Sequence, residues 1–210
     1  MSTHLFQAAV AGLGWRYVLG TLRTTVAVTS LAEAARAAAA CAAVTGDARL
    51  DLRPDRLVLT IEPCTPETVS LAGRLTEAIR GLDLETAPAQ TQRIEVGVDA
   101  LDIPAVRPFW KAALAYVDTP EGPDAHGAPL IDPLDLAPAV WFQQMDAPRP
   151  QRNRLHLDVS VPHDEAESRL QAALAAGGTL VSAAHAPAFW VLADPEGNEL
   201  CITTWQGRDG

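Results

Sequence analysis

The order of apolar and polar positions predicts short strands and helices along the first 80 residues. Two runs rich in aromatic and β-branched residues, 15–19 and 22–28, indicate strands. The Ala-rich run 34–43 indicates a helix, and the alternating run 50–61 indicates further strand. A second helix is expected over 65–79. This ββαββα order is typical of an antiparallel sheet with helices on one face.

Capping residues mark the ends of both helices. Ser30, followed three residues later by Glu33, forms a capping-box signature before the Ala-rich run. Thr65 followed by Pro66 is an N-cap with proline in the first turn, and Gly81 ends that helix. These signals predict where each helix begins and ends.

The second half of the chain repeats one pattern at a spacing of roughly 60 residues. A strand, a helix and further strands follow one another twice. Asp102 is expected to cap the first helix, and Asp164 or His163 the second. The expected strands and helices are 94–98, 102–114, 138–143, 155–161, 165–176 and 179–181.

The residues from Phe189 to about Trp205 predict a hairpin. Two apolar runs flank Asp194-Pro195-Glu196-Gly197-Asn198. Pro195 fixes φ at the start of a turn, while Gly197 and Asn198 tolerate positive φ. The segment 85–92 has no periodicity. The fold class is therefore α+β, with one domain at 1–82, a linker at 83–91 and a second domain at 92–210.

The charge and the cysteine content exclude several classes of partner and site. The formal net charge of -10 argues against nucleic acid and anionic membranes, which require a basic surface. Neither a secretory signal nor a membrane-spanning run is present in the sequence. Three widely spaced cysteines indicate neither disulfides nor a zinc knuckle. We expect a cytoplasmic homodimer that takes a small-molecule ligand.

Four segments of the second half resemble the glyoxalase-like branch of the vicinal oxygen chelate superfamily. They are Phe109 to Tyr116, Trp141-Phe142-Gln143, Asn153 to Val159, and the turn from Asp194 to Asn198. The resemblance implies two βαβββ modules around one concave pocket. In the metal-dependent members, that pocket holds a divalent ion.

The resemblance places the metal positions on Glu95, His156 and Cys201, with a further counterpart near Gln143. The family carboxylate is replaced by Cys201, which removes the hard oxygen that Mg²⁺, Mn²⁺ or Fe²⁺ prefers. We therefore expect no obligatory metal cofactor. If a divalent metal is bound, its ligands would be Glu95, His156 and Cys201.

The predicted pocket residues follow from the same strands. Alternation places His156 and Asp158 on one face of their strand, opposite Leu155 and Leu157. His156 is the candidate catalytic residue. Candidate ligand-binding residues are Glu95, Trp110, Trp141, Gln143, Asp158 and Trp190. Three indoles in a small domain favour a flat or apolar ligand.

The first half resembles pterin-4a-carbinolamine dehydratases over about residues 12–80. The carriers are Gly14-Trp15, Gly20-x-Leu22, the Ala-rich helix, the strands over 50–61, and Leu71-Ala72. In that family, a His-His-Pro sequence before the strand pair and a later histidine transfer the protons.

Those catalytic positions hold Gly46-Asp47-Ala48 and Cys64 in this sequence. Since imidazole is absent there, the resemblance predicts a domain that has lost its dehydratase activity. Its expected role is structural, dimerising or ligand-binding.

Several functions stay open from the sequence. The first hypothesis is a small-molecule binder of the sequestering kind. The second is a metal-dependent lyase, isomerase or dioxygenase, and the third a metal-free enzyme with His156 as general base. A 4a-hydroxytetrahydrobiopterin dehydratase is the last alternative, which would depend on Asp47.

Overall fold

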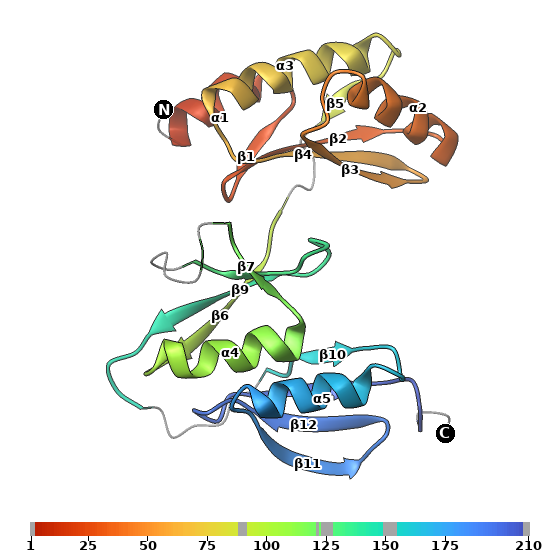
Figure 1. Ribbon diagram of the computed structural model, residues 1–210. Helices are drawn as coiled ribbons and strands as arrows, with labels where there is room; N and C mark the ends of the chain where they lie inside the picture. The colour runs from red at the N-terminus through yellow and green to blue at the C-terminus, as the bar shows by residue number, and fades with distance from the viewer. Residues whose placement is uncertain (1–2, 88–91, 121, 123–127, 149–154, 208–210) are drawn as a thin grey trace. The chain divides into compact units, whose positions relative to one another are not determined.

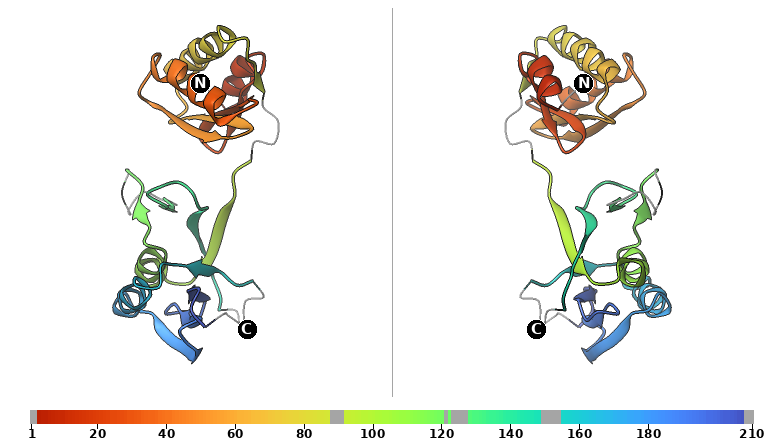
Figure 2. Two further views of the ribbon diagram at one scale, coloured as in Figure 1. Left: turned by 90° about the vertical axis from the view of Figure 1, so that its right-hand side faces the viewer. Right: turned by 90° about the vertical axis from the view of Figure 1, so that its left-hand side faces the viewer.

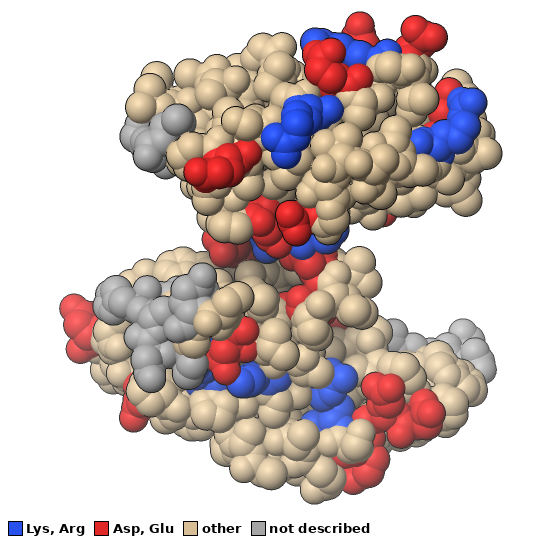
Figure 3. Space-filling model, turned by 45° about the horizontal axis from the view of Figure 1, so that its top comes forward, with Lys and Arg blue, Asp and Glu red and all other residues tan. Residues whose placement is uncertain are grey.

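The computed structural model describes residues 3–87, 92–120, 122, 128–148 and 155–207. The chain divides into two compact units, Met1–Arg93 and Ile94–Gly210, and each has its own apolar core. No helix within the described ranges is long and apolar enough to cross a membrane. On the face drawn in Figure 3, basic side chains are scattered among acidic ones rather than gathered into a basic patch.

The first unit is an antiparallel sheet with helices packed on one face (Figure 1). Its main strand order is β1-β2-β4-β3, and β5 pairs with β2. The elements are α1 (Thr3–Ala11), β1 (Arg16–Val18), β2 (Thr21–Ala27), α2 (Leu31–Ala42), β3 (Ala48–Arg53), β4 (Arg56–Ile61), α3 (Pro66–Arg80) and β5 (Thr86–Ala87).

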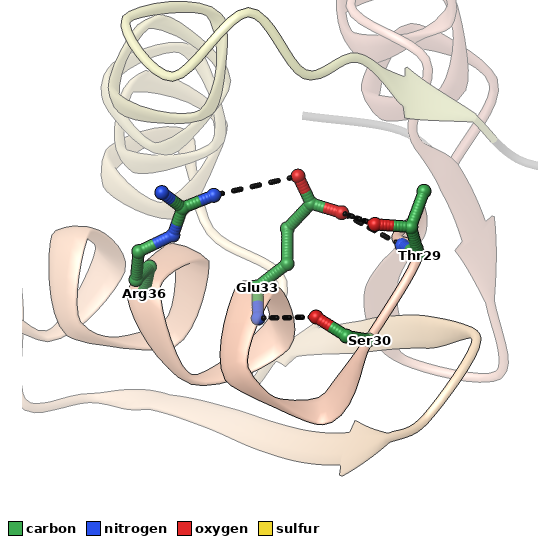
Figure 4. A network of polar contacts seen from close by, with 4 residues as sticks. All are labelled: Thr29, Ser30, Glu33 and Arg36. Carbon is green, nitrogen blue, oxygen red and sulfur yellow. Dashed lines mark hydrogen bonds and ion pairs between the residues drawn. The ribbon is translucent and has the colours of Figure 1, made fainter.

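Both predicted helix starts in this unit are confirmed. The Thr65 side chain accepts from Thr68 N, and the Thr68 hydroxyl in turn bonds Thr65 N. At α2, Ser30 Oγ accepts from Glu33 N at 3.2 Å (Figure 4). The capping box is shifted by one residue, because Glu33 bonds the backbone and hydroxyl of Thr29 rather than Ser30 N.

The core of the first unit explains the Gly14-Trp15 pair. Trp15 is fully buried, and its Nε1 donates to Thr76 Oγ1 of α3 at 2.9 Å. Gly14 has φ +77°, and a Cβ there would lie 2.3 Å from the carbonyl oxygen of Thr86. Only glycine fits that position, since the left-handed backbone and the close approach both exclude a side chain.

The second unit repeats βαβββ twice, as the sequence predicts. Each module forms its own four-stranded sheet, in the orders β6-β9-β8-β7 and β10-β13-β12-β11. The elements are β6 (Glu95–Ala100), α4 (Ile103–Leu114), β7 (Val117–Asp118), β8 (Leu130–Ile131), β9 (Ala139–Gln144), β10 (Asp158–Ser160), α5 (Ala166–Ala175), β11 (Thr179–His185), β12 (Phe189–Ala193) and β13 (Glu199–Thr203).

One apolar core joins the two modules. Figure 2 shows α4 and α5 lying side by side on the same side of the sheets. Core residues come from the strands and helices of both modules, including Phe109, Leu170 and Ile202. The first strands, β6 and β10, stand at an edge of their respective sheets. We call the boundary between these two edge strands the seam.

Several expectations differ from the structure. Helix α1 was not predicted from the sequence, and residues 83–91 were expected to form a linker, whereas Thr86–Ala87 pairs with β2. The expected strand 155–161 is described as strand only over Asp158–Ser160. Neither Asp164 nor His163 caps α5, whose N-cap Glu165 makes no side-chain capping bond. Residues 88–91 of the expected linker, and Asn153 and Arg154 of the resemblance, lie outside the described residues.

Candidate functional site

Asp194 organises the turn that the sequence singled out. Its buried carboxylate accepts from Glu196 N and from both the backbone and the side-chain amide of Asn198, each at 2.9 Å. The same carboxylate accepts from Trp110 Nε1 of α4 at 2.9 Å. Asp194 therefore ties the last turn of the second module to the helix of the first.

A second contact from this turn crosses between the modules. Glu196 Oε2 accepts from Leu101 N at 2.8 Å, and Oε1 accepts from Asp102 N at 2.6 Å. These N–H groups lie at the start of α4, where the backbone lacks helical partners and the helix dipole favours an anion. We call the contacts of Asp194 and Glu196 with the first module the clamp.

A cavity of about 510 Å³ lies at the seam beside the clamp. Its polar lining combines an imidazole, two carboxylates and an amide, from His156, Asp99, Glu199 and Asn198. The remaining walls are Val96, Gly97, Val98, Trp110, Leu155 and Leu157. This site, the His156 cavity, can surround a small organic molecule with both apolar and hydrogen-bonding groups.

Only two of the predicted site residues, His156 and Trp110, line this cavity. Trp110 is buried and donates a hydrogen bond to Asp194, so it connects the two modules as well as lining the cavity. Asp158 lines a different cavity at the seam. Trp190 pairs with Ile202 and packs, partly buried, against the apolar core of this unit.

The other predicted residues lie around the seam. Glu95 and Gln143 are exposed, and the Gln143 amide contacts the carbonyl of Gln144. Trp141 pairs with Gly97, and its indole covers that residue so closely that a Cβ at Gly97 would lie 3.1 Å from the ring. Cys201 is 6% exposed and shares a small recess with His156 and Glu199.

Strand register relates Cys201 to a residue of the first module. Cys201 pairs with Asp158, two residues after His156, and Trp141 pairs with Gly97, two residues after Glu95. With Glu95 matched to His156, as the resemblance implies, Trp141 stands at the position equivalent to Cys201, two residues before Gln143. An indole offers no metal-ligating atom, so this module contributes only Glu95 to the implied metal set.

The donor set does not fit a divalent ion. Within the described parts of the chain, no three His, Cys, Asp or Glu side chains are close enough together to hold a metal. A catalytic site of this kind requires about three protein ligands.

Three polar residues of the cavity lining were not predicted as site residues: Asp99, Asn198 and Glu199. A signal for Asp99 was present, since it alternates with Glu95 and Gly97 on one face of β6. Glu199 likewise lies on the same face of β13 as Cys201. Their convergence depends on how the two modules meet, which alternation within one strand does not reveal.

Comparison with known proteins places the second unit in a family. Residues 95–203, more than half of the chain, match the model of the glyoxalase-like domain. No curated protein matches the sequence.

Similar solved structures include a glyoxalase/bleomycin resistance protein/dioxygenase family enzyme from Burkholderia phytofirmans PsJN. It is 19% identical, with a TM-score of 0.43, over 52% of this chain and 95% of that one. A glyoxalase-related enzyme from Fulvimarina pelagi is 18% identical, with a TM-score of 0.43, over 54% and 88%. The fosfomycin resistance protein FosX from Listeria monocytogenes is 8% identical, with a TM-score of 0.42, over 55% and 92%.

The family match agrees with the double βαβββ module and covers both first strands and the final turn. The chain belongs to the glyoxalase-like domain family.

Proposed function

We propose that this protein binds a small organic molecule in the His156 cavity, with its own side chains as the only polar contacts. The observation that carries the proposal is the cavity itself, about 510 Å³ at the seam of a family fold. Apolar walls would supply most of the binding free energy. His156 and the neighbouring polar groups would fix the orientation of the ligand.

A thermal-shift screen of small organic molecules tests this role. At least one compound is expected to raise the Tm of the native protein, and His156→Ala should abolish that shift. A ligand at 100 times its Kd stabilises the folded state by about 2.7 kcal/mol. His185→Ala is the matched control, because His185 is exposed, stacks on Phe189 and lies outside the cavity lining. A screen without hits, or hits that His156→Ala leaves unchanged, would reject the assignment.

The proposal includes the absence of an obligatory metal. Support comes from the indole of Trp141 at the ligand position of the first module and the thiol of Cys201 at that of the second. Elemental analysis of protein purified without a metal-affinity tag should show substoichiometric Fe, Mn, Ni and Zn. Near-stoichiometric metal that disappears in His156→Ala would overturn this part and favour a metal-dependent lyase, isomerase or dioxygenase.

For the first unit we propose a pterin-dehydratase-like domain without dehydratase activity. The strand and helix order from β1 to α3, with helices on one sheet face, supports the assignment. The candidate base Asp47 is exposed and its backbone N–H bonds Thr45 Oγ1. Burial raises the pKa of Cys64, which keeps this thiol protonated at neutral pH.

A carbinolamine dehydration assay of the full chain should show no turnover above the uncatalysed rate. Asp47→Ala provides the second arm. Turnover that survives this change would mean that an unrecognised residue carries the chemistry, and turnover that is lost would identify Asp47 as a base. Either result contradicts the proposal.

A further inference from the structure

The repeat extends to the hydrogen bonds of a second turn, between β8 and β9. Asp132-Pro133 opens that turn, as Asp194-Pro195 opens the turn between β12 and β13. In each, the Asp carboxylate accepts from the N–H two and four residues later, and the Asp carbonyl accepts from the N–H three residues later. The residue at that third position has positive φ in both, as Asp135 and Gly197. The two turns are therefore structural counterparts.

The counterparts differ at the residue that makes the clamp. The position of Glu196 is taken by Leu134, which is 72% exposed and cannot accept hydrogen bonds. The helix start that would receive the corresponding contact is that of α5, whose N-cap makes no side-chain bond. Among the described residues, the clamp is thus present at one end of the seam and has no equivalent at the other.

A second cavity lies at the end without the clamp. It measures about 560 Å³ and is lined by 157–162, which includes β10, and by parts of the Asp132 turn, among them Asp132, Leu134 and Ala137. The His156 cavity is built in the same way, from β6 of one module and the residues Asn198 and Glu199 of the other module's turn. Val96 and Leu157 line both cavities. By the repeat, the Asp132 cavity is the counterpart of the His156 cavity.

The polar groups in the walls of the Asp132 cavity are held by the protein itself. The Asp132 carboxylate accepts three backbone N–H groups, from Leu134, Leu136 and Ala137. Three further bonds engage the other polar groups: Tyr116 hydroxyl to Pro138 carbonyl, Ser160 hydroxyl with Thr203 hydroxyl, and Arg169 Nη1 to Ala113 carbonyl.

Only one lining polar side chain remains, the solvent-exposed Asp158. The rest of the lining is aliphatic, including Val96, Leu114, Val140, Leu157 and Val159. An anionic ligand would lose hydration there and would meet the Asp158 carboxylate, while the one cation of the lining, Arg169, already bonds the Ala113 carbonyl and lies 3.9 Å from Glu165.

We propose that the Asp132 cavity is a second ligand site, which takes a neutral apolar molecule of aromatic or hydrocarbon character. The repeated module gives the fold two equivalent cavities. The His156 cavity carries an imidazole, carboxylates and an amide, whereas the Asp132 cavity has a mainly apolar lining. A volume of about 560 Å³ suits a molecule of two to three rings. This site stands whether or not the His156 cavity binds a ligand.

Two fluorescent probes that differ by one charged group test the proposal. N-phenyl-1-naphthylamine is neutral, and 8-anilinonaphthalene-1-sulfonate has the same rings with an added sulfonate. The full chain should bind the neutral probe at least about tenfold more tightly, since the sulfonate would be desolvated near the Asp158 carboxylate and beside an Arg169 that is already paired with Glu165. Equal affinity, or preference for the sulfonate, would overturn the proposed ligand class.

Matched variants locate the probe. Ala137→Trp introduces an indole at an exposed lining position and should reduce neutral-probe affinity at least about fivefold by filling the cavity. Leu136→Trp is the control, because Leu136 is 84% exposed, neighbours Ala137 and lies outside the lining. His156→Ala should leave probe binding unchanged.

The opposite pattern, with binding lost in His156→Ala and kept in Ala137→Trp, would assign the probe to the His156 cavity and refute the second site. Thermal melting of each variant establishes that it folds. If Ala137→Trp lowers the Tm, Leu134→Lys, which brings a charge to an exposed lining position, replaces it with the same expectation.

Light scattering tests whether a second copy of the chain occupies the cavity. Concentration-dependent dimerisation that excludes the neutral probe also counts against the proposal.

Discussion

A single glutamate connects the two modules at the start of α4. Glu196 accepts two backbone N–H bonds there, from Leu101 and Asp102, and both bonds are charge-assisted. In the sequence alone, Glu196 looks like any exposed polar residue of a turn. Its role depends on a contact across 94 to 95 residues of chain, which no local pattern records.

Glu196→Ala should lower the free energy of unfolding by about 1–2 kcal/mol, because two donors at a helix start lose their acceptor at a largely exposed site. Urea unfolding monitored by circular dichroism measures the change. Glu167→Ala is the control, since the Glu167 carboxylate accepts a hydrogen bond from Gln171 on the exposed surface of α5, and this change should alter stability by about 0.5 kcal/mol or less. Equal effects of the two substitutions would contradict the importance of the clamp.

At the scale of single elements, the start of α2 shows how capping depends on pH. Hydrogen bonds from the Thr29 backbone and hydroxyl lower the pKa of Glu33, and Arg36 contributes a weaker attraction. A carboxyl with a lowered folded-state pKa stabilises the protein above its unfolded pKa. That contribution is lost as the pH falls through the folded value.

Glu33→Gln should therefore reduce stability at pH 7 and have little effect at an acidic pH below the lowered folded-state pKa, where the native carboxyl is protonated. Ser30→Ala should cost about 1 kcal/mol at both pH values, because the hydroxyl cap does not titrate. Urea melts at the two pH values distinguish these patterns. A loss in Glu33→Gln that is independent of pH would refute the role of the charge.

The elements themselves were predicted where a local rule applies. The starts of α2, α3 and α4 follow from Ser30, Thr65 and Asp102, whose side chains bond the backbone three residues later. The two-residue strands β5, β7 and β8 lack such a signal, since each depends on a partner strand. The cap of α5 was predicted wrongly because a suitable residue type at His163 or Asp164 does not ensure capping geometry.

At the scale of the whole molecule, the two cores predict two independently folding parts. We expect limited proteolysis to cleave between Ala87 and Ile94, the last strand residue of one unit and the first residue of the other. The fragment 94–210 should then unfold cooperatively in a thermal melt, with its Tm unchanged by Trp15→Ala in the parent chain. Cleavage within either unit, or a fragment without a cooperative transition, would show that the units depend on each other.

The sequence predicted the fold of the second unit better than its site. Repeated strand and helix signals are local, so the double module could be read from periodicity. The cavities form where two modules meet, and their lining draws on Asp99, Asn198 and the Asp132 turn, residues with no distinctive local pattern. His156 was predicted because a family motif marks it, whereas the packing of Trp190 against the core of this unit could not be read from the sequence around it.

Because the clamp lies at one end of the seam, the two ends should differ in how strongly they resist separation of the modules. Opening at the His156 end must break the bonds of Glu196 and Asp194 to α4, whereas separation at the Leu134 end breaks apolar contacts and the bond from Arg169 to the Ala113 carbonyl. We therefore expect the modules to separate more readily at the Leu134 end than at the His156 end. We predict slower hydrogen exchange at the Leu101 and Asp102 amides than at the first amides of α5, with Glu196→Ala removing the difference.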